Sequence, residues 1–268
     1  MTPGEHAESL IDELGISEPR DLDVEAIAYD SGVSVAYADL QGCDATLVGL
    51  GNHAIATIRP STEVRQRFSV AHEIGHWSEH RGRSFTCRVD DVDTNLASDK
   101  KLEREADQYA AHLLMPRRLF KPQLTGVQAP AFKHIIGISQ TFKTSILATC
   151  LRLTELNAFP LVVASYGPDG RRWQLRSKDV PSRWGLKSHL HEDSFAVDFF
   201  QRGTPSSGPS KQPADVWFDN DDADQYEIVE EYITGHGGGV LVILTIADEE
   251  MLNAGYDRDL WPGKTRRG

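Results

Sequence analysis

The chain lacks the features that mark secreted, membrane-spanning or nucleic-acid-coating proteins. Its three cysteines, Cys43, Cys87 and Cys150, are widely spaced and form no CxxC pair, which excludes a disulfide framework and favours a reducing compartment. No run approaches the ~18–20 apolar residues of a membrane span, and the N-terminus has no apolar signal core. Lys and Arg number 28 against 40 Asp and Glu, a formal charge of −12, which argues against broad binding to nucleic acids or anionic membranes. We therefore expect a soluble, cytoplasmic protein that does not bind nucleic acid directly.

The composition is that of a globular protein. With 268 residues, 40% of them hydrophobic and 25% charged, the chain can bury a real core in one large or two smaller domains. Apolar periodicity and breakers predict helices at 4–14, 22–31, 62–80, 99–114, 130–136 and 140–156, and strands at 33–38, 45–50 and 53–58. From Pro160 short strand-like runs alternate with turn residues (LVVASY, WQLRS, AVDFF, VWF and VLVILTI). We expect domains at 1–157 and 158–268.

One motif carries the chemistry. Residues 72–76 read His-Glu-Ile-Gly-His, the H-E-x-x-H signature of zinc hydrolases. Residues i and i+4 share a helix face, so His72 and His76 can both bind one Zn²⁺ at roughly 2.0–2.1 Å. Glu73 lies ~100° around the helix and is free to act as general base. The alternative is a helix with two surface histidines, but its apolar flanks and the mid-helix Gly75, which costs ~1 kcal/mol relative to alanine, indicate a buried helix with a close neighbour.

A hydrolytic zinc needs a third protein ligand and one open position. In the helix of residues 101–116, Glu103 and Asp107 share a stripe that becomes apolar toward its C-terminal end. We predict Glu103 as the third ligand and Asp107 as the acceptor of a hydrogen bond from a ligand histidine. The alternative is that both acids form surface salt bridges. Glu105 points elsewhere, and His112, on the polar stripe, is expected in solvent.

These two segments resemble the ImmA/IrrE family of zinc peptidases. The segment FSVAHEIGHWSEH (68–80) and the segment EREADQYAAHLLMP (103–116) match the family's H-E-x-x-H and its downstream E-x-x-x-[ND] helix ending in LLMP. The resemblance covers about residues 1–155. It implies zinc ligands at His72, His76 and Glu103 and a general base at Glu73, with Asp107 where the family often has Asn.

The resemblance also implies a fold and a function. The fold is α+β: a zincin-like N-terminal peptidase domain, with a small sheet beside the active-site helix, followed by a β-rich C-terminal domain. Members commonly cleave a partner transcriptional repressor in phage, mobile-element or stress-response settings, and some carry a GAF-like sensor domain. We therefore predict a zinc-dependent endopeptidase of regulatory type, whose residues 158–268 regulate it or recognise its substrate. The alternative is a metal-bound sensor or partner-binding regulator with little proteolytic activity.

Several weaker signals leave two interpretations open. Residues 131–156 resemble a helix-turn-helix with its turn at 137–139, but three basic residues are few for phosphate contact, which favours two packed core helices. Cys87 either masks the zinc as a thiolate or is a small buried residue. His80, four residues past His76, either extends the site or, as is usual at a helix end, lies in solvent, and we expect the latter. His53 is a candidate for substrate binding.

The C-terminal part offers three further expectations. Residues 202–214 hold eight Gly, Ser or Pro residues and predict a flexible loop. Residues 215–231 hold eight acids and no Lys or Arg, which indicates a solvated acidic face or a surface for a basic partner. Residues 237–247 predict a central strand rather than a phosphate loop, because no lysine follows the glycines.

Overall fold

The computed structural model describes residues 1–81, 85–87, 97–204, 206 and 208–254, without the side chains of 85–87 and 97–99. The chain forms two compact units, one of residues 1–125 and 137–148 and one of residues 126–136 and 149–268. The expected boundary between residues 157 and 158 stays a prediction. In the helical segment before it, residues 137–148 belong to the first unit and residues 126–136 and 149–157 to the second. Among the described residues, no helix is both long and apolar enough to cross a membrane.

The first unit contains the helices and strands that the N-terminal sequence predicts, together with two short elements that it does not predict, β4 and α5. They are α1 (Pro3–Glu13), α2 (Val24–Asp30), β1 (Val33–Tyr37), β2 (Ala45–Leu50), β3 (His53–Ile58), α3 (Glu63–Glu79), β4 (Phe85–Cys87), α4 (Ala97–Leu114) and α5 (Arg117–Phe120), with 3-10 turns at Pro19–Asp21 and Lys121–Leu124. Thr62 caps α3 by accepting a hydrogen bond from the backbone of Arg65, as the sequence predicts. The α+β class is thereby confirmed.

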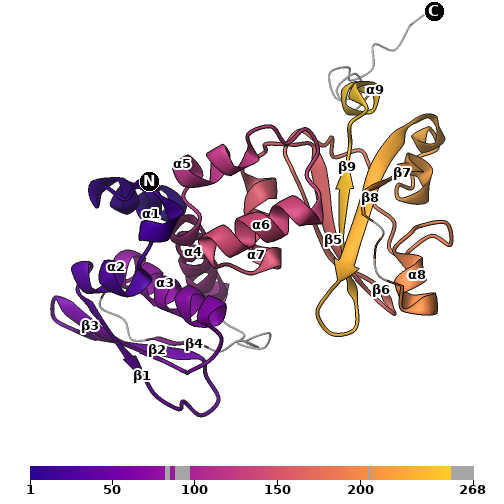
Figure 1. Ribbon diagram of the computed structural model, residues 1–268. Helices are drawn as coiled ribbons and strands as arrows, with labels where there is room; N and C mark the ends of the chain where they lie inside the picture. Colours follow the sequence, from indigo (N-terminus) through magenta and orange to yellow (C-terminus); the bar gives the residue numbers. More distant parts are fainter. Residues whose placement is uncertain (82–84, 88–96, 205, 207, 255–268) are drawn as a thin grey trace, which may run out of the picture. The chain divides into compact units, whose positions relative to one another are not determined.

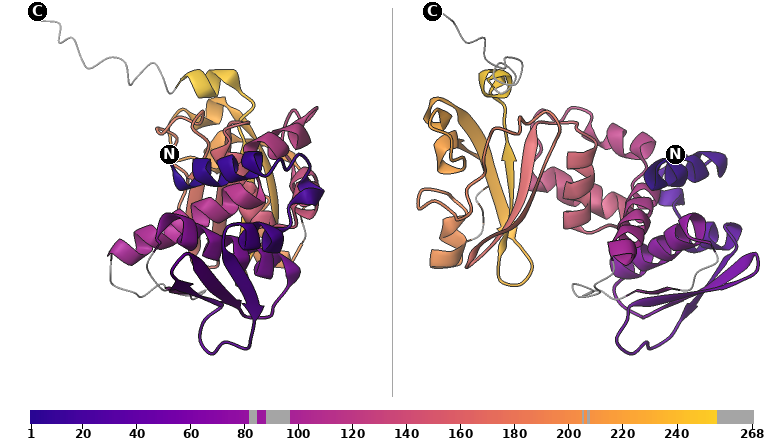
Figure 2. Two further views of the ribbon diagram at one scale, coloured as in Figure 1. Left: turned by 90° about the vertical axis from the view of Figure 1, so that its left-hand side faces the viewer. Right: turned by 180° about the vertical axis from the view of Figure 1, so that it is seen from behind.

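A small mixed sheet supports α3. The strand order is β1-β3-β2-β4, with β1 parallel to β3 and the other pairs antiparallel. The β2–β3 hairpin turns at Gly51, whose φ of 63° suits glycine. Leu47 and Ala56 are buried on one face, whereas Val48 and Ile55 are exposed on the other. Figures 1 and 2 show the helices of this unit on one side of the sheet, so the exposed face is the one away from α3.

Helices α3 and α4 approach most closely at Gly75. A Cβ atom on Gly75 would lie 3.0 Å from Tyr109 Cβ and 3.1 Å from the Cα and carbonyl oxygen of Ala106. Two of these three atoms belong to the backbone of α4, which moves only if the helix moves. The mid-helix glycine thus has the close neighbour that the sequence indicated, and the crossing sets where the first turns of α4 lie relative to α3.

The predicted turn at 137–139 is wrong. Helix α6 (Phe132–Phe142) continues through Gly137, and α7 (Ile146–Glu155) begins later than predicted. The turn falls at Lys143, whose φ is 53°, and Ser145 caps α7 by accepting a hydrogen bond from Ala148 N at 3.0 Å. Helical backbone bonds through Gly137 outweigh its modest intrinsic cost.

The second unit is built on a five-stranded antiparallel sheet. Its strands are β5 (Leu161–Gly167), β6 (Gly170–Arg176), β7 (Ser210–Pro213), β8 (Glu227–Thr234) and β9 (Val240–Thr245), in the order β6-β5-β9-β8-β7. The central position of β9, buried along its whole length, confirms the predicted central strand. One face carries a core that includes Trp184, Trp217, Phe218 and Tyr166.

Three strand or loop predictions in this unit are wrong. Most of the run AVDFF belongs to helix α8 (Val197–Arg202), from which Phe199 and Phe200 both pack against the core. The run VWF is not a strand but overlaps a 3-10 turn (Ala214–Val216) and one isolated bridge. The unit also contains a 3-10 turn at Ala223–Gln225 and helix α9 (Glu249–Asn253). The predicted loop at 202–214 contains β7, which pairs with β8.

The acidic run is only partly a solvated face. Glu230 is 1% exposed and accepts hydrogen bonds from Ala196 N at 2.7 Å and Trp217 Nε1 at 2.8 Å, while burial raises its pKa. Glu231 is also buried and accepts a hydrogen bond from Phe132 N at 2.6 Å, at the start of α6. These two acids are therefore structural, because each satisfies backbone or indole N–H groups inside the second unit.

Two glycine-to-alanine changes should act in opposite directions on stability. Gly75→Ala gains about 1 kcal/mol of helix propensity but adds overpacking of roughly 1–3 kcal/mol against α4, a net loss of up to about 2 kcal/mol. Gly137→Ala, in α6 with nothing within 4 Å of the added Cβ, should stabilise by up to about 1 kcal/mol. Denaturant unfolding followed by circular dichroism measures both. Equal stabilisation by both changes would contradict the close crossing.

Candidate metal centre

Helix α3 presents the predicted motif on its buried side. His72 is 7% exposed, while Glu73 and His76 are fully buried. The neighbouring Val70, Ile74 and Trp77 are buried as well, as the apolar flanks of the motif indicated. The interpretation of two surface histidines is thereby excluded, and both imidazoles have lost most of their contact with water.

Helix α4 brings Glu103 to the two histidines. Its Oε2 lies 3.1 Å from His72 Nε2, and its Oε1 lies 3.3 Å from His76 Nε2. The two Nε2 atoms lie 3.0 Å from each other. One ligand atom from each residue can be chosen so that all three lie within 4.8 Å of one another, and within the described part of the chain this is the only such group of three.

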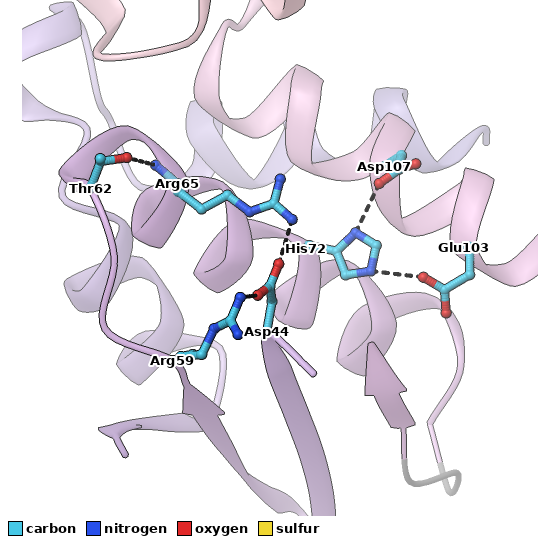
Figure 3. Close-up of polar contacts among 7 residues, drawn as sticks. All are labelled: Asp44, Arg59, Thr62, Arg65, His72, Glu103 and Asp107. Atoms are coloured by element: carbon cyan, nitrogen blue, oxygen red, sulfur yellow. Dashed lines mark hydrogen bonds and ion pairs between the residues drawn. The ribbon is translucent and has the colours of Figure 1, made fainter. Parts of the chain in front are cut away.

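Asp107 has the predicted position beside His72. Its Oδ1 lies 3.0 Å from His72 Nδ1, so that His72 contacts Asp107 through one ring nitrogen and Glu103 through the other (Figure 3). A carboxylate accepts hydrogen bonds and does not donate them, so the proton of a neutral His72 ring lies on Nδ1. The lone pair of its Nε2 then points at His76 and Glu103, which is the form of histidine that binds a metal.

The donor set fits zinc. Ligand atoms about 2.0–2.1 Å from a tetrahedral zinc lie roughly 3.3–3.4 Å from one another, close to the separations of 3.0–3.3 Å among His72, His76 and Glu103. Two imidazoles and a carboxylate are also the ligands of several hydrolytic zinc sites. Three electron-rich atoms so close together repel each other unless a cation lies among them.

The acid–base properties favour the ligand forms of these groups. Burial lowers the pKa of His76, and the hydrogen bond that a protonated His76 donates to Glu103 opposes that change only in part. Burial by itself would raise the pKa of Glu103, but hydrogen bonds with His72 and His76 outweigh it and lower the pKa to about 2. Glu103 is therefore an anion near neutral pH, and His76 takes up a proton less readily than a free imidazole does.

The segment that contains this geometry matches a known protein family. Residues 29–154 match the family model of a peptidase family described as the IrrE N-terminal-like domain. The chain carries an IrrE N-terminal-like domain. This confirms the ImmA/IrrE resemblance, and all five predicted site residues lie within the matched segment. No curated protein sequence gives a significant match to the chain.

A solved structure shares the fold over most of the chain. A Mycobacterium tuberculosis transcriptional regulator aligns with a TM-score of 0.59 at 16% identity, covering 91% of this chain and 76% of that one. Identity this low shows a similar fold and no more.

A triad of charged residues fastens the start of α3 in the IrrE-like domain. Asp44, just before β2, accepts hydrogen bonds from Arg59, just after β3, and from Arg65 Nη2 at 2.6 Å (Figure 3). Arg65 lies seven residues before His72, on the same face of α3. Sequence reasoning missed this triad, because its three members lie on three different elements and form no motif.

Two expectations about other histidines are wrong. His80 and His112 are 9% and 6% exposed rather than solvated. His112 Nδ1 lies 2.7 Å from Glu8 Oε1 of α1, and His80 Nε2 lies 2.9 Å from Glu105 Oε2 of α4. Helical periodicity placed them correctly on their own helices, but it did not reveal that other elements cover those faces.

The remaining candidates receive no support from the site. His53 is exposed and follows the same alternation as Ile55, so it lies on the sheet face away from α3 and is not a candidate for substrate binding. The side chain of Cys87 lies outside the described residues, and its proposed masking of the metal stays a prediction.

We expect the protein to bind one zinc ion per chain. The substitution Glu103→Gln should weaken zinc binding by roughly 100-fold or more, because a neutral amide replaces an anionic ligand. Competition titration with a chromophoric chelator measures the affinity. Glu79→Gln is the matched control, because Glu79 also bonds a histidine, His6, at 2.7 Å, but outside the site. Equal zinc affinity in the Glu103 and Glu79 variants would contradict the ligand assignment.

Proposed function

We propose that this protein is a zinc-dependent endopeptidase of regulatory type. The observation that carries the proposal is the convergence of His72, His76 and Glu103, with the buried Glu73 beside them, inside an IrrE N-terminal-like domain. His72, His76 and Glu103 hold the metal, and Glu73 is the general base.

The chemistry divides between the metal and the protein. Bound zinc supplies a Lewis acid that polarises the scissile carbonyl and lowers the pKa of water. Glu73 accepts the proton of the attacking water on a carboxylate oxygen and then passes it to the leaving amine. Its buried position on the regular helix α3 restricts the conformations that this carboxylate can adopt. Asp107 holds the His72 ring in the orientation that binds the metal.

The proposed substrate is a partner protein, most simply a helix-turn-helix transcriptional repressor. Its support is the match of residues 29–154 to the IrrE N-terminal-like domain, because members of the family that the sequence resembles commonly cleave such repressors. The cytoplasmic location belongs to the same proposal, and Cys43 and Cys150, which are both buried and free, fit a reducing compartment.

The second unit, with a sheet and core of its own, is proposed as the part that recognises the substrate or senses a signal. A GAF-like fold for it remains part of this proposal.

Direct DNA binding through α6 and α7 has no support in the structure. Arg152 is 1% exposed and donates to Glu155 at 2.9 Å, and Lys143 pairs with Glu63 at 2.6 Å. The exposed residues of α7 include Leu147 and Leu151, which offer nothing to phosphates. The interpretation as packed helices therefore explains this segment better than DNA recognition.

Replacing Glu73 with Gln should leave zinc bound while cleavage falls by roughly 10²–10⁴-fold or more, because the amide cannot accept the proton. The measurement is mass spectrometry of a helix-turn-helix repressor of the same organism, first of all any encoded next to this gene, after incubation with zinc-loaded enzyme, with Glu79→Gln as control.

Cleavage by the Glu73→Gln protein at the unmodified rate contradicts the proposed mechanism. If the unmodified protein binds zinc but leaves the neighbouring repressor intact, the result favours the alternative of a metal-bound sensor or partner-binding regulator.

A further inference from the structure

A buried hydrogen-bonded chain extends from the second ligand histidine. His76 Nδ1 lies 3.2 Å from His80 Nδ1, one helical turn later, and His80 Nε2 lies 2.9 Å from Glu105 Oε2 on α4. The side chains of His76 and His80 are 0% and 6% exposed, whereas that of Glu105 is 29% exposed and lies 3.6 Å from Lys101 Nζ. The chain therefore runs from the metal centre to the surface of α4.

The proton positions along this chain follow from its outer end. A carboxylate only accepts, so Glu105 places a proton on His80 Nε2 and leaves a lone pair on His80 Nδ1. That lone pair accepts a hydrogen bond from Nδ1–H of His76. The remaining nitrogen of His76, Nε2, then carries a lone pair that points at His72 and Glu103. Every hydrogen bond of the chain thus favours the tautomer of His76 that binds a metal.

We propose that His80 and Glu105 are positioning residues for the metal ligand His76. The inference rests on the proposed zinc function and adds two residues to the site. Hydrogen bonds to the free nitrogen of a ligand histidine fix its ring orientation and increase its basicity. His80 contacts neither the metal nor the substrate, so it acts through His76.

The two ligand histidines have unequal support. The partner of His72, Asp107, has a side chain that is 57% exposed, so water competes for that hydrogen bond. The partner of His76 is buried, and a hydrogen bond in a low-dielectric interior is stronger and more costly to lose. Loss of His80 should therefore weaken zinc binding more than loss of Asp107.

Helix α4 supplies an acid to every part of this arrangement. Glu103 meets both metal-binding nitrogens, Asp107 meets His72, and Glu105 meets His80. Because the three histidines lie on α3 and its C-terminal cap and the three acids lie on α4, the orientation of both ligand rings depends on how closely the two helices pack.

The decisive experiment compares two buried histidines that each bond a glutamate. His80→Leu removes the acceptor for His76 and should weaken zinc binding by roughly 10–100-fold. His112→Leu is the matched control, because it breaks the buried pair with Glu8 without touching a ligand, and should leave zinc affinity unchanged. Affinities are measured on full-length protein by chelator competition, at a temperature where circular dichroism shows each variant folded.

Two further variants separate positioning from packing. His80→Asn keeps an acceptor near the position of Nδ1 and should restore most of the affinity that His80→Leu loses. Asp107→Ala should weaken zinc binding less than His80→Leu. In cobalt-substituted protein, the visible absorption should change with His80→Leu and return with His80→Asn, because it reports the geometry of the ligand field.

The outcomes distinguish this inference from the proposed function. If the unmodified protein binds no zinc, the proposed function itself is wrong. If it binds zinc and His80→Leu binds it equally well, or if Asn is no better than Leu, the positioning role of His80 is overturned while the metal centre stands. If His80→Leu alone does not fold, the comparison of His80→Asn with Glu105→Ala by the same titration decides the role of the chain.

Discussion

The site depends on an electrostatic conflict that a cation resolves. Two imidazole nitrogens and a carboxylate lie 3.0–3.3 Å apart, and the hydrogen bond to Asp107 turns the lone pair of His72 toward the others. Buried polar groups are normally paired with donors, not with one another. The fold keeps these three together through the packing of α3 on α4, and a divalent cation among them converts repulsion into ligation.

The closeness of the two helices is what makes this convergence possible. At Gly75 the absence of a side chain lets the backbone of α4 approach α3 so closely that a Cβ atom would be crowded against it. Glu103 lies one helical turn before Ala106, the contact point, so its position depends directly on that crossing. At the other end of α3, the pairing of Asp44 with Arg65 fixes the helix to the sheet. The candidate ligands His72, His76 and Glu103 are therefore held by the packing of two helices, not by loops.

Much of this was predictable from the sequence where the signal is local. Residues at i and i+4 define His72 and His76, and helical stripes selected Glu103 and Asp107 from a helix that also carries Glu105. Short β-rich runs and a Gly-Asn turn between two of them predicted β1, β2 and β3, and the family resemblance implied the small sheet. What the sequence did not reveal depends on neighbours distant in the chain. His80 and His112 look solvated on their own helices and become buried only when Glu105 and Glu8 pack over them. In the same way, Glu230 and Glu231 look like part of an acidic surface until the N–H groups that they bond are known.

The most direct test of the metal centre is the position of the metal itself. Crystals of the full-length protein should give one anomalous scattering peak at the zinc absorption edge, about 2.0–2.2 Å from His72 Nε2, His76 Nε2 and a carboxylate oxygen of Glu103. A structure with no anomalous peak between α3 and α4, or with a zinc held by other residues, would contradict this account.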